Sequence, residues 1–165
     1  MRRLLLIAVT VVLSGCGFHL RGSYTLPFDT LFINQPETAE LRAVLKRNIE
    51  ASTATRVVNE AKDAQASLTV LNDVPAKIVL SLSSAGRVRE YQLVRTFVFR
   101  IHDAANRDLM PIGKIVIRRD ISFNDDLVLS KEAEEALLWR DIQNDLVQQL
   151  LRRIAAAKAA PTEEE

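Results

Sequence analysis

The chain contains few of the residues that enzymes and metal centres depend on. Among its 165 residues are one cysteine, two histidines and five glycines. A single cysteine cannot form an intramolecular disulfide, and so few glycines leave no Gly-rich loop to hold a phosphate. The sequence also lacks H-E-x-x-H, G-x-S-x-G, C-x-x-C and Walker motifs. These absences argue against an enzyme, a metal site and a bound cofactor, and they favour a binding or assembly protein.

A group of acidic residues near the C-terminus does not change this interpretation. Asp125-Asp126 precedes a predicted helix, where Asp commonly serves turns and caps. Glu132, Glu134 and Glu135 follow at the start of that helix, where the helix dipole favours negative charge. The alternating ligand positions of a calcium loop are absent. We therefore interpret these carboxylates as helix-start electrostatics rather than as general acids or bases.

The N-terminus has the features of an export signal. Met1-Arg2-Arg3 is basic, and the apolar run that follows, from Leu4 to Leu13, is too short to span a bilayer, which takes about 20 residues. It ends in Leu13-Ser14-Gly15-Cys16, which resembles the lipobox of bacterial lipoproteins. We predict that residues 1–15 are a signal peptide and that Cys16 carries a diacylglycerol thioether and an N-acyl chain. Several acyl chains together anchor a protein stably in a membrane. The alternative is an ordinary signal followed by an incidental cysteine.

Charge is almost balanced overall but uneven along the chain. Arg2 and Arg3 account for two of the 22 basic residues, so 20 remain beside 21 acidic residues after the signal. This balance gives no argument for nucleic acid. Between residues 85 and 119, however, basic residues outnumber the acidic Glu90, Asp103 and Asp108. The excess favours an anionic ligand, with a solvated sheet face as the equally weighted alternative. The basic residues are Arg87, Arg89, Arg95, Arg100, Arg107, Lys114, Arg118 and Arg119.

The apolar pattern predicts one α+β domain over residues 16–157, with an N-terminal tether and a disordered tail at 158–165. Gly86, in the turn between two of the strands, is expected to take a positive φ. We expect a mainly antiparallel sheet of about four strands with two helices packed on one face. The predicted strands are 31–33, 66–83, 87–102 and 112–123, and the predicted helices are Glu37–Ser52, opened by Pro36, and Ser130–Ala157, capped by Ser130.

The last predicted helix has an unusually broad apolar side. It is roughly twice the stripe of about 100° that a helix needs to cover a sheet. Either this helix is sunk between two layers of its own domain, or its far side meets a partner. The small size of the domain favours the partner. The apolar positions are Leu138, Trp139, Ile142, Leu146, Val147, Leu150, Leu151 and Ile154.

Several segments, taken in order, resemble one family over nearly the whole chain after the signal. They are Cys16-Gly17-Phe18-His19-Leu20-Arg21-Gly22, Arg89-Glu90-Tyr91-Gln92-Leu93, Ser122-Phe123-Asn124-Asp125-Asp126, Leu129-Ser130-Lys131-Glu132-Ala133-Glu134-Glu135 and Gln148-Gln149-Leu150-Leu151-Arg152-Arg153-Ile154. Each segment is a weak signal alone, but their order and spacing resemble the LptE family of lipopolysaccharide-assembly lipoproteins.

The resemblance implies a specific role. LptE proteins are α+β plugs inside the outer-membrane barrel LptD, and the pair inserts lipopolysaccharide into the outer leaflet. Gly17 after the lipidated cysteine, in place of Asp, implies sorting to the outer membrane. The resemblance further implies that Lys131, at the start of the last helix, contacts lipopolysaccharide. At the central turn Ser84 stands where a relative has Arg, so Arg87 and Arg89 are the expected basic contacts there.

Two other classes of protein remain as alternatives. One is a different outer-membrane lipoprotein, such as a barrel-assembly accessory or a secretion pilotin. Co-purification with an LptD-type barrel would distinguish an LptE protein from these. The other is a lipoprotein enzyme without a recognisable motif, which a buried group of convergent polar side chains would support.

The lipobox gives a direct prediction about processing. The variant Cys16→Ala removes the thiol that accepts the diacylglycerol, so the precursor is expected to stay uncleaved and to incorporate no palmitate. Labelling of cells with radioactive palmitate, followed by immunoprecipitation, measures this. Normal palmitate labelling of the variant would contradict the assignment of Cys16.

Overall fold

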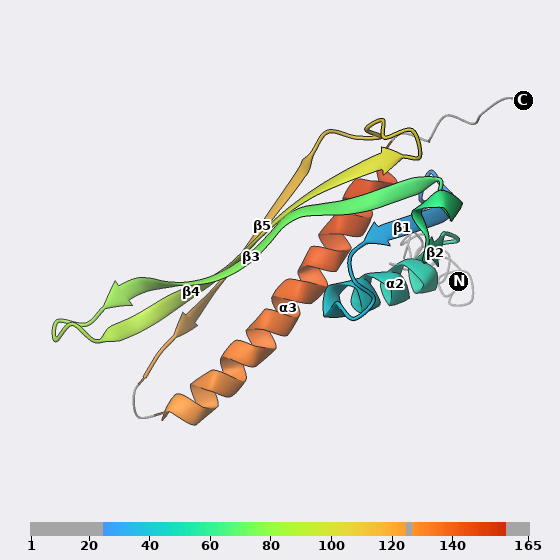
Figure 1. Ribbon diagram of the computed structural model, residues 1–165. Coiled ribbons are helices and arrows are strands. Elements are labelled where there is room, and N and C mark those ends of the chain that lie inside the picture. Colours follow the sequence, from blue (N-terminus) through green and yellow to red (C-terminus); the bar gives the residue numbers. More distant parts are fainter. Residues whose placement is uncertain (1–24, 125–126, 158–165) are drawn as a thin grey trace, which may run out of the picture.

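The computed structural model describes residues 25–124 and 127–157. The predicted signal peptide, Cys16, Asp125-Asp126 and the C-terminal tail lie outside the described residues. Within these residues the chain forms five strands, two α-helices and one short 3-10 helix (Figure 1). The elements are β1 (Thr30–Asn34), α2 (Glu40–Ser52), β2 (Arg56–Val58), η1 (Ala61–Asp63), β3 (Ala66–Leu82), β4 (Val88–Asp103), β5 (Gly113–Ser122) and α3 (Val128–Ala155).

The strands form one mixed sheet in the order β2-β1-β3-β4-β5. The antiparallel arrangement of β3, β4 and β5 agrees with the sequence pattern. The prediction of about four mainly antiparallel strands was wrong in two details. β2 is a fifth strand of only three residues, too short to show alternation, and β1 runs parallel to both β2 and β3. The parallel pairing of β1 and β2 follows from the helix α2 that crosses over between them.

The β3–β4 hairpin is the longest feature of the sheet. Its strands have 17 and 16 residues, well above the usual length of 3–10 residues. Gly86 has a φ of 75° in the connecting turn, as the sequence predicts. Figure 1 shows the hairpin extending beyond the helices, so that its tip and the start of α3 form the distal end of the molecule, opposite α2.

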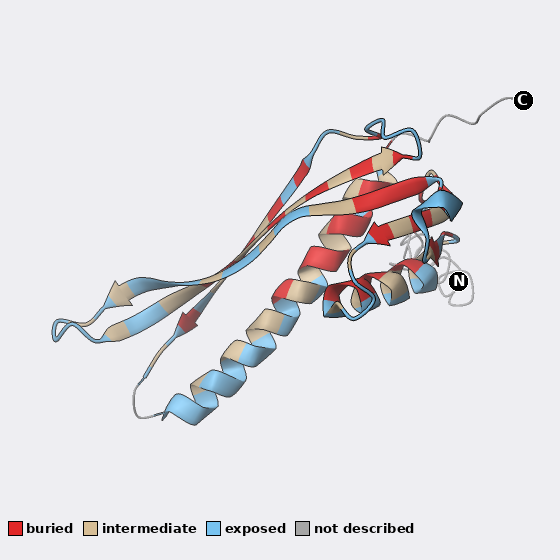
Figure 2. Ribbon diagram, viewed as in Figure 1, coloured by how far each residue is buried: buried red, intermediate tan, exposed pale blue. Residues whose placement is uncertain are grey.

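The core lies on one face of the sheet, at the end where both helices pack (Figure 2). Leu93, Phe97, Phe99 and Ile101 of β4, which share one face of the strand, point into it and are fully buried. The period of two matches one buried face of a sheet. Ile115, Ile117 and Ile121 of β5 and Leu41, Leu45 and Ile49 of α2 complete the same cluster.

The broad apolar side of α3 is accounted for within the domain itself. The apolar positions of this side from Ile142 onward are all buried in the core that the sheet and α2 share. They are Ile142, Leu146, Val147, Leu150, Leu151 and Ile154. The expectation that this breadth indicates a partner was therefore wrong for these residues. The first half of α3, from Val128 to Asp141, contributes no buried residue.

Both helix starts differ from the predicted positions. α3 begins at Val128, and its N-cap residue Leu127 makes no capping hydrogen bond with its side chain. Ser130 lies inside the first turn, where its hydroxyl donates to the carbonyl oxygen of Leu127, so it is not the N-cap. α2 begins at Glu40 because residues 36–39 form a turn in which Ala39 N–H donates to Pro36 O. Neither helix of the described part is long and apolar enough to span a membrane.

The unequal burial of α3 predicts unequal effects of substitution. Leu146→Ala removes a fully buried side chain and is expected to lower the free energy of unfolding by about 2–5 kcal/mol. Leu129→Ala, at a site that is 83% exposed, is the matched control and is expected to change it by less than about 0.5 kcal/mol. Denaturant unfolding of both variants measures this, and equal losses would contradict the division of the helix.

Candidate functional site

The tip of the hairpin presents the first two basic residues of the predicted site. The turn is held by hydrogen bonds from Ser83 N–H to Arg87 O (2.7 Å) and from Gly86 N–H to Ser83 O (2.9 Å). Arg87 and Arg89 follow directly and both are exposed. The backbone around Arg89 is fixed, since its carbonyl oxygen accepts from Phe123 N–H at 2.7 Å. The two guanidinium groups therefore extend from a well-formed turn.

The third predicted residue, Lys131, lies close to them but does not project freely. Its Nζ donates to Ser122 Oγ at 3.0 Å and to Glu134 Oε2 at 2.8 Å, and its side chain is only 15% exposed. Ser122 pairs with Glu90, the neighbour of Arg89. The structure thus brings Lys131 to the same end of the molecule as Arg89, where it also joins α3 to the end of β5.

A second contact between the hairpin and α3 escaped the sequence interpretation. Lys77 of β3 places its Nζ 2.6 Å from Glu135 Oε2 and 4.2 Å from the centre of the Tyr91 ring. Trp139 Nε1 donates to the other oxygen of Glu135 at 3.3 Å. Tyr91 in turn meets Phe123 edge to face, at 5.4 Å between ring centres. No local pattern could reveal these contacts, because Lys77 and Glu135 are 58 residues apart.

Exposed apolar side chains surround these polar groups at the distal end. Leu127, Leu129 and Leu137 of the α3 region are 53%, 83% and 57% exposed. Ile78, Val79, Leu80 and Leu82 of the hairpin are similarly exposed. Cations and apolar groups on one end can together hold a molecule that has both negative charge and hydrocarbon.

At least four of the basic residues between positions 85 and 119 form ion pairs within the described part of the fold. Their partners come from a neighbouring strand, the adjacent loop and α3, which charge counting cannot foresee. The ion pairs are Arg95 with Asp73, Arg100 with Asp108, Arg107 with Asp103 and Arg119 with Asp145. The argument for an anionic ligand therefore does not rest on these four residues; Arg89, Lys114 and Arg118 are exposed and lie outside these ion pairs.

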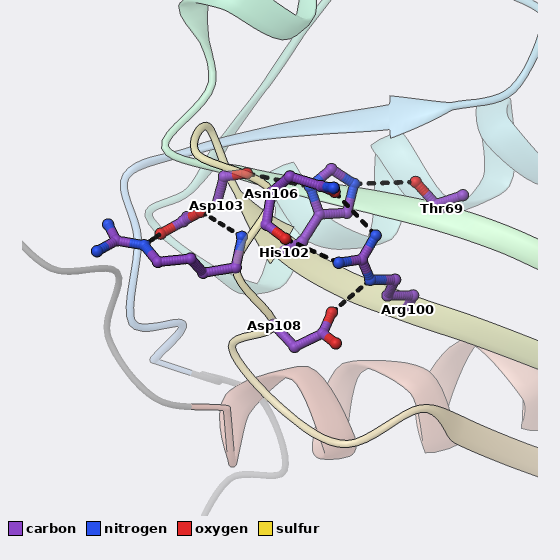
Figure 3. Close-up of polar contacts among 7 residues, drawn as sticks. Thr69, Arg100, His102, Asp103, Asn106 and Asp108 are labelled. Atoms are coloured by element: carbon purple, nitrogen blue, oxygen red, sulfur yellow. Dashed lines mark hydrogen bonds and ion pairs between the residues drawn. The ribbon is translucent and has the colours of Figure 1, made fainter.

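The densest polar cluster of the described chain lies at the opposite end of β4 and serves the fold (Figure 3). Arg100 binds Asp108, Asn106 Oδ1 and the Asn106 carbonyl oxygen, which fixes the loop after β4. Hydrogen bonds from Arg107 N–H and from its guanidinium lower the pKa of Asp103 below its ordinary value. His102 uses both ring nitrogens, on Asp103 O and on Thr69 Oγ1. Each of these groups has a partner within the cluster, which gives the cluster a structural role.

The described residues also contain no group of three His, Cys, Asp or Glu side chains that could hold a metal ion. With the polar groups of Figure 3 committed to the loop, the distal end is the best candidate for a functional site.

Comparison with known proteins identifies relatives that share both sequence and fold. A family model for LptE, lipopolysaccharide-assembly, matches residues 28–154. The LPS-assembly lipoprotein LptE of Pectobacterium atrosepticum is 26% identical over 154 residues, which cover 92% of this chain and 83% of that protein. The LptE of Yersinia enterocolitica is 27% identical over 160 residues, covering 95% and 76%. The solution NMR structure of an uncharacterized lipoprotein B from Nitrosomonas europaea has a TM-score of 0.74 and 39% identity, covering 85% of this chain and 91% of that one. The chain therefore belongs to the LptE family of lipopolysaccharide-assembly lipoproteins.

Proposed function

We propose that this protein is the lipopolysaccharide-binding plug of an LptD-type outer-membrane barrel and that the pair inserts lipopolysaccharide into the outer leaflet. Membership of the LptE family supports a role in lipopolysaccharide transport at the outer membrane, and this family is one of assembly lipoproteins rather than of enzymes. The proposal adds the barrel partner, the position in its lumen and the residues that contact the lipid. Residues 16–157 form the plug, anchored from the periplasmic side by the acyl chains on Cys16.

One observation of the structure carries the lipid-binding part of this proposal. The distal end combines exposed cations at the hairpin tip with exposed leucines around the start of α3. Lipopolysaccharide has phosphates beside acyl chains, so it matches both kinds of side chain. Arginine is well suited to the phosphates because its guanidinium can donate two parallel hydrogen bonds. We assign Arg87 and Arg89 to direct contact and Lys131 to the same site, with a share in holding α3.

Co-purification tests the barrel partner. Extraction of the tagged full chain in mild detergent is expected to yield a one-to-one complex with a lipopolysaccharide-translocating barrel, identified by mass spectrometry. Depletion of the protein is expected to lower both assembly of that barrel and surface lipopolysaccharide. A different stoichiometric partner, such as a secretion channel, would assign the protein to another class of outer-membrane lipoprotein.

Charge reversal at the tip tests the lipid contacts. Each charge-assisted contact is worth roughly 1.5–3 kcal/mol, so the double variant Arg87→Glu/Arg89→Glu is expected to lose at least about tenfold in affinity for lipopolysaccharide. The matched control is Arg47→Glu/Arg152→Glu, which makes the same change of charge at two exposed helical positions. Lys131→Ala is measured separately with its melting temperature, because its hydrogen bonds also join α3 to β5. Unchanged binding of the tip variant would remove Arg87 and Arg89 from the site.

A further inference from the structure

The sheet has a second face that neither helix covers. Along β4 the core-facing residues alternate with Val94, Thr96 and Val98, whose side chains therefore point to the opposite side. Val94 is itself only 9% exposed, but it does not belong to the core cluster that its neighbour Leu93 joins. Figure 1 shows α2 and α3 both on the core side. We call the uncovered side the open face.

The strand register makes a continuous apolar stripe on the open face. Val94 lies between Ala76 and Arg118, Thr96 between Val74 and Val116, and Val98 between Asn72 and Lys114. Ile78 extends the stripe towards the hairpin tip, opposite Gln92. The β3 side of the stripe is the more accessible, since Val74 and Ile78 are 47% and 50% exposed, whereas Val98 and Val116 are half-buried.

The stripe has the dimensions of a hydrocarbon chain. From the Ile78–Gln92 pair to Val98 it extends six residues along β4, which is about 20 Å at roughly 3.3 Å per residue. The hydrocarbon core of a bilayer is about 30 Å thick, so each leaflet is about 15 Å thick. An acyl chain lying along β4 could therefore be covered by the stripe over most of its length.

Two cations border the stripe along β5. Lys114 and Arg118 are both exposed, and among the described residues no acidic side chain pairs with either of them. Asp120, two residues from Arg118 on the same face of β5, keeps its negative charge and accepts a hydrogen bond from the neutral Gln92. An apolar stripe with unpaired cations along one border complements an anionic group attached to hydrocarbon.

We propose that the open face is a second lipid-binding surface, on which an acyl chain of lipopolysaccharide lies along β4 while Lys114 and Arg118 contact its phosphate. The choice of lipopolysaccharide as the acylated anion rests on the proposed function. The lumen wall of an outer-membrane barrel matches this face poorly, because the interior of such barrels is polar.

Two variants of the full chain, purified in mild detergent, separate the apolar and charged parts of this surface. Val94→Thr/Val98→Thr/Val116→Thr keeps side-chain shape and strand preference but adds hydroxyl groups. Lys114→Glu/Arg118→Glu reverses the border charges. The valine variant is expected to weaken binding of lipopolysaccharide at least about fivefold, and the charge-reversal variant about tenfold. The control Arg47→Glu/Arg152→Glu, with the same change of charge on the helices, is expected to bind normally.

Deacylated lipopolysaccharide and a photo-crosslinker make the test specific for the acyl chain. The valine variant should bind the deacylated molecule as the unchanged protein does, because only the hydrocarbon contact is lost. A benzophenone amino acid at Thr96 should crosslink to lipopolysaccharide, and one at Arg47 should not. Normal lipopolysaccharide binding by both sheet variants, or an equal loss in the charge control, would overturn the proposal.

Two further outcomes have distinct meanings. Loss of the barrel from sheet variants that still bind lipopolysaccharide would make the open face a protein interface and would overturn its role in lipid binding. Failure of the unchanged protein to bind lipopolysaccharide at all would refute the lipid-binding part of the proposed function, and the open-face proposal with it. If the sheet variants lose binding while the tip variant binds normally, the open-face proposal is supported and the assignment of Arg87 and Arg89 is refuted.

Discussion

The burial of the C-terminal half of α3 is the interaction on which the rest of the structure depends. Six of its side chains, from Ile142 to Ile154, are buried in the core. At roughly 1.5–3 kcal/mol for each buried aliphatic side chain, burial of the six contributes on the order of 10 kcal/mol to stability. This is far more than one hydrogen bond or ion pair contributes. The end of the molecule that contains α2 and the C-terminal half of α3 is therefore held firmly by its core. The hairpin and the start of α3 extend from it without a core of their own.

The contacts that hold the distal half are of a different kind and size. The ion pair of Lys77 with Glu135 is partly exposed, and such pairs are worth about 0–1 kcal/mol. The contact of Lys77 with Tyr91 adds about 0.5–1 kcal/mol at an exposed site. These two contacts position the start of α3 against the hairpin, but they contribute much less free energy than the burial of the C-terminal half of α3. A ligand bound at the distal end would compete only with weak polar contacts and would leave the core intact.

Period and register explain which parts of the fold the sequence predicted. The long strands β3, β4 and β5 and the core residues of α3 follow strict periods of two and about 3.6, and all were identified. β2 was missed because three residues carry no period, and the parallel pairing of β1 depends on a crossover that its five residues cannot encode. The start of α3 was misplaced because Ser130 has the chemistry of an N-cap but lies within the first turn.

The candidate site was predictable only where its residues are neighbours in sequence. Arg87 and Arg89 flank a turn that Gly86 marks, and the turn lies where it was expected. Charge counting could not reveal that Arg95 and Arg119 are paired with carboxylates that lie 22 and 26 residues away. The family resemblance identified Lys131 but not its hydrogen bond to Ser122, which depends on where β5 ends.

The alternation along β4 connects the stability of the fold to its capacity to bind lipid. Three antiparallel strands need helices on only one face to form a core, and an antiparallel sheet usually presents polar residues on its other face. Here the other face carries Val94, Val98 and Val116 among its polar residues, although threonine would satisfy the same strand preference. Nothing in the packing of the core requires valine at these positions, because α2 and α3 lie on the opposite side of the sheet. An apolar ligand or partner on the open face accounts for them, and Lys114 and Arg118 along its border favour one that carries negative charge.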